Sequence, residues 1–290
     1  MRPVLIIVCV IALCICAGCT GTGQKSSYSV DNNGVLAVTC APVTTSEEVL
    51  FSNETYTKTR IIMHTQTGDV ISYLAAPTQP KATIVYVPGA GEKIDGHEQR
   101  MVQYAAAGYA FLFVDIRGNG AETPGYPFNP EADYVLFEKG QWPQFYGIVC
   151  DLSTARRMLA DRFDVPVYAL GSSNGGRYAA VAAAVDPQFS GYIGISTSGF
   201  GMAGEQYSGD ARRFLLSVDP DNYISRISPR PVWIFHSKTD SIIPFMDGKK
   251  LYERAEDPRT FTEFDGGHGI NSDVDDRIIL QWAQIYGNRG

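Results

Sequence analysis

The sequence has no excess of positive charge and no internal repeat. Its 24 lysines and arginines are outnumbered by 31 aspartates and glutamates, so the net charge is −7, and no basic run follows the first residues. Duplex binding needs clustered cations that displace counterions, so this composition argues against nucleic acid as a partner. The absence of a repeat of roughly 20–50 residues argues against a solenoid or a propeller.

The common metal-binding and nucleotide-binding motifs are also absent. The sequence has no His-Glu-x-x-His pair, no glycine-rich phosphate loop ending in lysine and no dinucleotide fingerprint. We therefore expect chemistry that needs neither a metal nor a dissociable cofactor. With 44% hydrophobic residues in a chain of 290, there is enough apolar material for a large packed core.

The N-terminal apolar run, residues 4–17, is fourteen residues long and follows Arg2. A bilayer-spanning helix needs about 20 apolar residues, so the run is short for a span and fits the apolar region of a secretory signal. We therefore expect a signal peptide over residues 1–18 and an exported protein. A signal peptide cleaved elsewhere nearby and an uncleaved anchor are the alternatives.

The end of this run resembles the lipobox of exported lipoproteins. Small residues, Ala17 and Gly18, precede Cys19, although Cys16 stands where the lipobox usually has leucine. The resemblance implies that Cys19 is lipidated and anchors the protein to the outer face of the cell membrane. A secreted protein without an anchor is the alternative.

Only two cysteines, Cys40 and Cys150, lie beyond the predicted signal peptide and the predicted lipidation site Cys19. Export would allow a disulfide between them, and two buried thiols are the alternative. Residues 19–45 are rich in threonine, serine and glycine, which predicts a flexible tether. The folded domain is then expected over residues 46–290.

Short apolar runs alternate with helical periodicity from about residue 58 onward. The runs cover residues 82–87, 110–114, 166–170, 192–195 and 232–235. Continuous apolar runs separated by helices indicate an α/β fold, in which a doubly wound, mostly parallel sheet of about eight strands has helices on both faces. A hairpin around Thr67-Gly68-Asp69 adds antiparallel strands at one edge.

The segment Gly171-Ser172-Ser173-Asn174-Gly175-Gly176 follows the third of these runs and precedes an alanine-rich helix. A Gly-x-Ser-x-Gly spacing between a strand and a helix places the serine on a tight turn, where its hydroxyl is exposed. A serine hydroxyl is a weak nucleophile that needs this exposure and a neighbouring base. The helix N-terminus adds an amide and a partial positive charge for a developing oxyanion. The segment therefore predicts Ser173 as a nucleophile.

The base must come from four histidines. His64 lies in the early hairpin and is expected to be structural, whereas His97 precedes a helix and fits either helix entry or a substrate contact. His236 lies at the end of an apolar run, which favours a packed core position. His268 lies in a glycine-flanked loop after the last predicted strand, where its imidazole is free to reach Ser173. We therefore expect His268 to be the base.

The carboxylate that orients the base should also lie at a strand end. Asp240 follows the run 232–235 after a short loop, and a solvated turn residue is its alternative role. Asp265 competes, but it lies three residues before His268 and is expected to shape that loop. The order Ser173, Asp240, His268 is the one expected when the nucleophile is on a central strand and its partners follow later strands.

These residues resemble the α/β-hydrolase superfamily over residues 58–287. Within this superfamily, the compact form of the chain is similar to the dienelactone-hydrolase-like and prolyl-oligopeptidase-like members. The resemblance implies that Ser173 is the nucleophile of an elbow, Asp240 the acid and His268 the base.

The resemblance also implies an oxyanion hole and a structural turn. Pro88-Gly89-Ala90-Gly91 matches a loop that usually reads His-Gly, so one oxyanion amide would come from Ala90 and the other from Asn174. Pro88 replaces the usual histidine of that loop. Residues 115–120 resemble the Asp-x-Arg-Gly-x-Gly turn of the superfamily, for which we expect a structural role.

The expected function is that of an exported serine hydrolase that cleaves carboxylic esters through an acyl-serine intermediate. Its substrate would be a small-molecule ester or peptide. A serine peptidase or acyltransferase with the same triad, and a non-catalytic surface binding protein with the same fold, are the alternatives. Residues 197–229 form either a surface connection or a small cap that lines an acyl or aromatic pocket.

Overall fold

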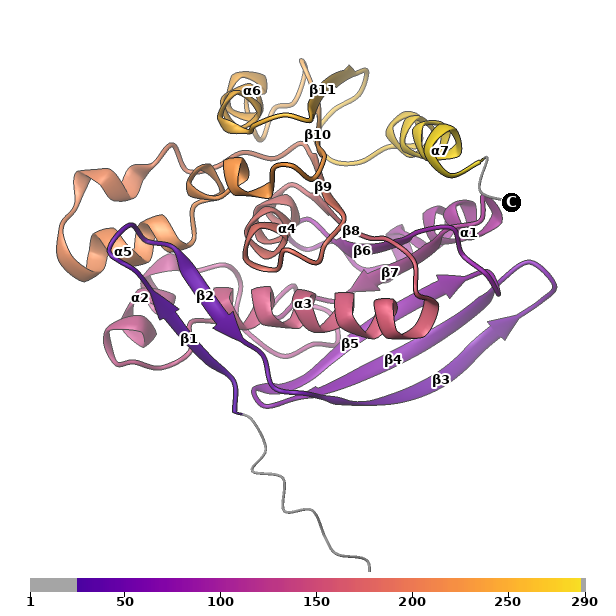
Figure 1. Cartoon of the computed structure of the whole chain (residues 1–290), viewed down its shortest axis with the longest axis horizontal. Coiled ribbons are helices and arrows are strands. Elements are labelled where there is room, and N and C mark those ends of the chain that lie inside the picture. Colours follow the sequence, from indigo (N-terminus) through magenta and orange to yellow (C-terminus); the bar gives the residue numbers. More distant parts are fainter. Residues whose placement is uncertain (1–24, 288–290) are drawn as a thin grey trace, which may run out of the picture.

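A nine-stranded mixed sheet lies at the centre of the part of the chain that the structure describes (Figure 1). This computed structural model describes residues 25–287, so the predicted signal peptide 1–18 and the predicted lipidation site Cys19 lie outside the described residues. Across the sheet, the strand order is β11-β10-β9-β8-β6-β7-β5-β4-β3. The strands are β3 (Thr44–Ser52), β4 (Thr57–Thr65), β5 (Gly68–Ala76), β6 (Thr83–Val87), β7 (Ala110–Val114), β8 (Val167–Ser172), β9 (Gly191–Ile195), β10 (Val232–Ser237) and β11 (Arg259–Phe264).

The sheet has a parallel part and an antiparallel part. Strands β7, β6, β8, β9, β10 and β11 pair in parallel, whereas β5, β4 and β3 pair antiparallel at one edge. The hairpin around Thr67 joins β4 to β5, as predicted. The α/β class and the antiparallel edge are therefore confirmed, and the sheet has one strand more than the expected eight or so.

Helices cover both faces of the sheet, and two apolar cores lie between them and the strands (Figure 1). Helices α1 and α7 lie on one face, and α3, α4 and α6 lie on the other. The helices are α1 (Glu98–Ala106), α2 (Pro130–Glu138), α3 (Gln144–Phe163), α4 (Asn174–Val185), α5 (Gly209–Ser217), α6 (Phe245–Arg254) and α7 (Ser272–Tyr286). Within residues 25–287, no helix combines the length and the apolar character needed to cross a bilayer.

The central strands are apolar because both of their faces are covered. Every residue of β6, β7, β8, β9 and β10 is buried, whereas all nine residues of the edge strand β3 are exposed. The register aligns the carboxyl ends of the parallel strands, with Val87 beside Gly171 and Ser172 beside Ile195. Loops after these strands therefore meet at one edge of the sheet.

Part of the predicted tether is folded. Strands β1 (Ser27–Val30) and β2 (Leu36–Thr39) form a separate hairpin rather than a flexible linker. Val30 and Leu36 are buried, and the Leu36 N–H donates to the hydroxyl of Tyr223 at 2.8 Å. The threonine- and serine-rich composition hid this hairpin, because its stability comes from apolar side chains, Val30 and Leu36 among them, that pack against residues far along the chain.

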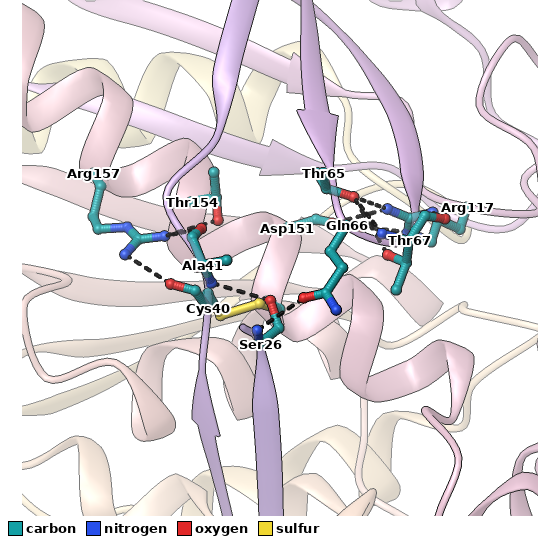
Figure 2. The surroundings of a disulfide bond; sticks show 11 residues. Ser26, Cys40, Ala41, Thr65, Gln66, Thr67, Arg117, Asp151, Thr154 and Arg157 are labelled. Carbon is teal, nitrogen blue, oxygen red and sulfur yellow. Dashed lines mark hydrogen bonds and ion pairs between the residues drawn. A yellow bond between two sulfur atoms is a disulfide. The ribbon is translucent and has the colours of Figure 1, made fainter. Parts of the chain in front are cut away.

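A disulfide joins Cys40, just after β2, to Cys150 in the middle of α3 (Figure 2). The guanidinium of Arg157 donates to the Cys40 carbonyl at 3.2 Å, and Ala41 donates to the hydroxyl of Ser26 at 3.0 Å. The pairing of the two cysteines, one of the two alternatives left by the sequence, therefore ties the N-terminal hairpin to the helical layer.

The excursion over residues 197–229 folds into α5 and three short 3₁₀ segments: η2 (Ala203–Gln206), η3 (Pro220–Asn222) and η4 (Ile224–Ile227). Phe214 of α5 is fully buried in the core formed with α3 and α4. Phe200 instead lines a cleft at the carboxyl edge of the sheet. The excursion therefore contributes both to the core and to a surface near the strand ends.

Candidate active site

Ser173 occupies the sharp turn between β8 and α4. Its φ of 53° lies in the left-handed region, where a non-glycine residue is strained and usually has a functional reason. The turn is tight because backbone segments meet there. A β-carbon placed at Gly175 would lie 2.2 Å from the Val87 carbonyl oxygen, and one placed at Gly171 would lie 2.4 Å from the Gly175 carbonyl oxygen. The two glycines are therefore required by close approach, as the motif predicts.

The structure brings Ser173, His268 and Asp240 together, although 67 and 28 residues separate them in the predicted order. The Nε2 atom of His268 lies 2.7 Å from Ser173 Oγ, and its Nδ1 atom lies 2.9 Å from both carboxylate oxygens of Asp240. An ionised carboxylate only accepts hydrogen bonds, so Nδ1 carries the proton and Nε2 accepts the hydrogen bond from the serine hydroxyl. This is the tautomer that a general base needs.

Asp240 is held in its ionised form. Burial alone would raise its pKa, but hydrogen bonds from the backbone N–H of Ile243, from His268 and from the backbone N–H of Ile242 outweigh burial and lower the pKa below its usual value. The two backbone bonds are each 2.9 Å long. The carboxylate is therefore fixed in charge and direction by the turn after β10.

The other three histidines lie in different surroundings. His236 is fully buried beside Asp240, and burial lowers its pKa, as expected of a packed core residue. His64 contacts Ser46 on the surface of the antiparallel edge. His97 lies at the start of α1 and contacts Glu92 at 3.3 Å, so it contacts a residue of the site rather than the nucleophile.

The two predicted oxyanion amides lie at neighbouring strand ends. Ala90 is in the loop after β6 and Asn174 is the first residue of α4. Within residues 25–287, neither backbone N–H donates a hydrogen bond to another protein group. Both donors therefore remain available to a ligand at the turn that carries Ser173.

Asn119 holds the loop that carries Ala90. Its Oδ1 atom accepts from the Gly91 N–H at 2.9 Å, and its Nδ2 atom donates to the carbonyls of Gly89 at 3.1 Å and Glu92 at 2.8 Å. Asn119 belongs to the turn 115–120, whose Arg117 pairs with Asp151 of α3 at 2.7 Å (Figure 2). The turn is structural, as expected, and its structural role includes fixing the loop that carries Ala90.

Glu92 is a site residue that sequence reasoning missed. Its carboxylate accepts from the Gly89 N–H at 2.8 Å. A β-carbon placed at Gly89 would lie 3.1 Å from Glu92 Oε1 and 3.3 Å from Ser173 Cβ, so the carboxylate lies close to the nucleophile. Burial would raise the pKa of Glu92, but bonds from His97 and Gly89 outweigh it and lower the pKa. The available sequence signal was an acidic residue three positions after the first glycine of the loop.

No metal site accompanies this arrangement in the described part of the chain. There, no group of three or more histidine, cysteine, aspartate or glutamate side chains is placed to hold a metal ion. The geometry is that of a hydroxyl, an imidazole and a carboxylate in series.

Several solved structures that superpose on this chain are named as esterases. An acetyl xylan esterase from Paenibacillus sp. R4 superposes with a TM-score of 0.67 at 17% identity, covering 84% of this chain and 89% of that one. A glucuronoyl esterase from Teredinibacter turnerae gives 0.58 at 15% identity, covering 90% and 82%. The chain has the α/β-hydrolase fold. Together, this fold and the Ser173–His268–Asp240 arrangement are those of a serine hydrolase.

Sequence comparison finds a known family that resembles part of this chain. Residues 78–216, from β6 to α5, match the family described as serine aminopeptidase, S33. The uncharacterized protein YfhR of Escherichia coli K12 is 29% identical over 160 residues, which cover 48% of this chain and 52% of YfhR. The match therefore spans about half the length of this curated relative.

Proposed function

We propose that this α/β hydrolase cleaves carboxylic esters through an acyl-Ser173 intermediate. The observation that carries the proposal is the position of His268, whose two ring nitrogens join Ser173 Oγ at 2.7 Å and Asp240 at 2.9 Å. The esterase names of the solved neighbours support an ester substrate, and a carbohydrate ester is the class that those names suggest.

The chemistry follows from the geometry of the site. His268 removes the hydroxyl proton while Ser173 Oγ attacks the ester carbonyl, and Asp240 stabilises the imidazolium that forms. The amides of Ala90 and Asn174 meet the tetrahedral oxyanion, and each such donor contributes about 3–4 kcal/mol where it has been measured. The imidazolium then protonates the leaving alcohol. Water, activated by His268, releases the acid from the acyl-enzyme in the same way.

A fluorophosphonate probe tests the nucleophile. Wild-type protein should be labelled and Ser173→Ala should not be. Ser172→Ala is the matched control, because the Ser172 hydroxyl is buried and makes no hydrogen bond within the described residues. Labelling that persists in Ser173→Ala would remove Ser173 from the mechanism.

A serine peptidase is the second candidate, and two observations favour it. The matched family is named for an aminopeptidase. The Glu92 carboxylate near the nucleophile also provides an acceptor for an ammonium group. Turnover of p-nitrophenyl acetate compared with aminoacyl p-nitroanilides separates the two functions, and product analysis with added alcohol detects an acyltransferase. Neither labelling nor turnover is expected of a non-catalytic binding protein.

We propose further that the enzyme is exported and anchored through a lipid on Cys19. The Ala17-Gly18-Cys19 sequence supports the anchor, and the Cys40–Cys150 disulfide supports export because disulfides persist in oxidising compartments. Substitution of Cys19 by Ser should abolish incorporation of labelled fatty acid and release the protein from the membrane fraction. Unchanged partitioning of Cys19→Ser would refute lipidation at this residue.

A further inference from the structure

A polar cleft of about 370 Å³ lies at the carboxyl edge of the sheet, and none of the three triad residues lines it. The start of α4, the loop after β9, the 3₁₀ segment η3 and the first turns of α6 form its walls. The lining residues on which the argument depends are Arg177, Ser198, Phe200, Asp221, Asp247 and Lys250.

The cleft is joined directly to the proposed active site. Arg177 lies four residues after Ser173, about one turn of α4, which is about 5.4 Å along the helix. The hydroxyl of Thr197 donates to the Ser173 carbonyl at 2.8 Å, and the next residue, Ser198, accepts from the Arg177 guanidinium at 3.2 and 3.1 Å. The other wall contains Ile243, whose N–H donates to Asp240. A substrate bound at Ser173 is therefore within reach of the cleft.

Among the cations that line the cleft within residues 25–287, Arg177 forms no ion pair at contact distance. Asp247 pairs with Lys250 at 2.9 Å, and Asp221 pairs with Arg254 at 3.6 Å. Within residues 25–287, no carboxylate lies within 4.0 Å of the Arg177 guanidinium, which lies over the Phe200 ring at 4.5 Å. Asp219 and Asp221 attract Arg177 from beyond that distance, but burial outweighs them and lowers the pKa of Arg177, so a ligand that accepted hydrogen bonds from the guanidinium would offset part of the cost of burial.

The donors of Arg177 are only partly used. Nε and Nη2 bind Ser198, whereas Nη1 has no hydrogen-bond partner among the described residues. The Phe200 ring covers one side of the Arg177 guanidinium, and Nη1 forms its free edge. These two features restrict the direction from which a hydrogen-bond acceptor can approach Arg177. A planar carboxylate satisfies such an edge through charge-assisted hydrogen bonds.

We propose that this cleft binds a carboxylate carried by the substrate, with Arg177 as the residue that pairs with it. The free edge of one guanidinium matches one carboxylate, and the neighbouring Asp219, Asp221 and Asp247 disfavour a phosphate dianion. Glu92 contacts Tyr86 and His97 on the α1 side of the sheet. Its carboxylate repels negative charge, so an anionic group of the substrate is directed to the α4 side. The inference rests on the proposed esterase function and narrows its substrate class to acidic esters.

A matched pair of esters tests this specificity. The 4-nitrophenyl monoester of glutaric acid and 4-nitrophenyl valerate have the same acyl length, and only the first carries a carboxylate. Wild-type enzyme should prefer the glutarate ester. Arg177→Gln should raise KM and lower kcat/KM for that ester by roughly 10- to 100-fold, the range for a charged hydrogen bond, and should leave valerate hydrolysis within about twofold.

Two further variants separate recognition from structure. Arg177→Lys keeps the charge and should restore part of the preference for the glutarate ester, whereas Lys250→Gln, which removes a paired lysine of the same cleft, should change it little. An equal loss on both esters in Arg177→Gln would show that Arg177 only supports the fold, and would overturn the proposal. A wild type without preference for the glutarate ester would overturn it as well.

A binding measurement keeps this test separate from the esterase proposal. Calorimetry on Ser173→Ala with monomethyl glutarate, a monoanion, should detect binding that is lost when Arg177→Gln is added. Binding together with absence of ester turnover would refute the esterase function and preserve the carboxylate site. Absence of binding together with active hydrolysis of valerate would refute the carboxylate site alone.

Discussion

At the scale of single residues, the site depends on how each polar group is held. Ser173 is strained, Asp240 is ionised and His268 is oriented by two bonds of 2.9 Å to one carboxylate. Each of these conditions follows from neighbours on other strands. A substitution that keeps the shape of one of these side chains but removes its charge therefore tests whether catalysis needs the charge or only the position of the group.

Asp240→Asn should lower kcat on a reactive ester by about 10⁴-fold. The amide cannot accept the His268 Nδ1 proton as a charged group does, and it favours the tautomer in which Nε2 no longer accepts from Ser173. Steady-state kinetics on p-nitrophenyl acetate measure the loss, with circular dichroism as the control for folding. A loss of less than about tenfold would contradict the proposed role.

Asp240 should also make the stability of the fold depend on pH in the acid range. Because its folded pKa is below its unfolded value of about 4, ionised Asp240 contributes stability that is fully present above pH 4 and is lost as the pH falls through the folded pKa. The difference in Tm between wild type and Asp240→Asn should therefore shrink below pH 4. A difference that is constant from pH 7 to pH 3 would argue against a lowered pKa.

At the scale of elements, loops after separate strands hold one another in place. The loop after β6 carries Ala90 and is fixed by Asn119, which lies in the loop after β7 and makes three hydrogen bonds to it. The turn between β8 and α4 contacts the same β6 loop through Gly175. The proposed oxyanion hole therefore depends on the ends of three strands.

Asn119→Ala should lower kcat by roughly 10- to 100-fold with a smaller effect on KM. The loop is released, so the Ala90 amide loses its fixed direction, and a whole oxyanion donor is worth about 100- to 1000-fold in kcat. Stopped-flow or steady-state rates on p-nitrophenyl acetate give the two parameters. An unchanged kcat would show that the loop keeps its conformation without Asn119.

Gly175→Ala should destabilise the fold by about 1–3 kcal/mol or more, because its new methyl group would meet the backbone of β6 at 2.2 Å. Gly96→Ala is the matched control, since a β-carbon there meets nothing within 4 Å. Urea unfolding followed by circular dichroism measures both variants. Equal stability of the two would contradict the close approach at the elbow.

At the scale of the whole molecule, the N-terminal hairpin is fastened to the hydrolase core over a long sequence distance. The disulfide links positions that are 110 residues apart, between the β1–β2 hairpin and α3. A cross-link over so long a loop restricts the unfolded chain strongly. The hairpin is therefore a fixed part of the domain once the bond has formed.

Replacing both Cys40 and Cys150 by Ser should lower the free energy of unfolding by about 2–4 kcal/mol. Thermal unfolding of the wild type with and without reductant, compared with the double variant, measures the effect. Reductant should lower the Tm of the wild type and leave that of the double variant unchanged. A wild-type Tm that does not respond to reductant would show that the bond adds nothing to stability.

The sequence predicted those parts of the fold that depend on local pattern. Continuous apolar runs identified the central strands because only strands covered on both faces are apolar throughout. Glycine spacing identified the elbow because only glycine tolerates backbone contacts at 2.2–2.4 Å. The hairpin β1–β2 was missed, because the surrounding serine and threonine residues suggested a tether, whereas its apolar side chains pack against residues far along the chain.

The sequence by itself determined the order and type of the central elements, the nucleophile turn and the few histidines from which a base could come. These properties depend on residues close together in the chain. Only the tertiary structure decided how closely His268 approaches Ser173, that Glu92 lies near it, that Cys40 and Cys150 pair, and that the Nη1 edge of Arg177 faces a cleft. Such facts concern distances between groups on different strands, and only the closed sheet brings those groups together.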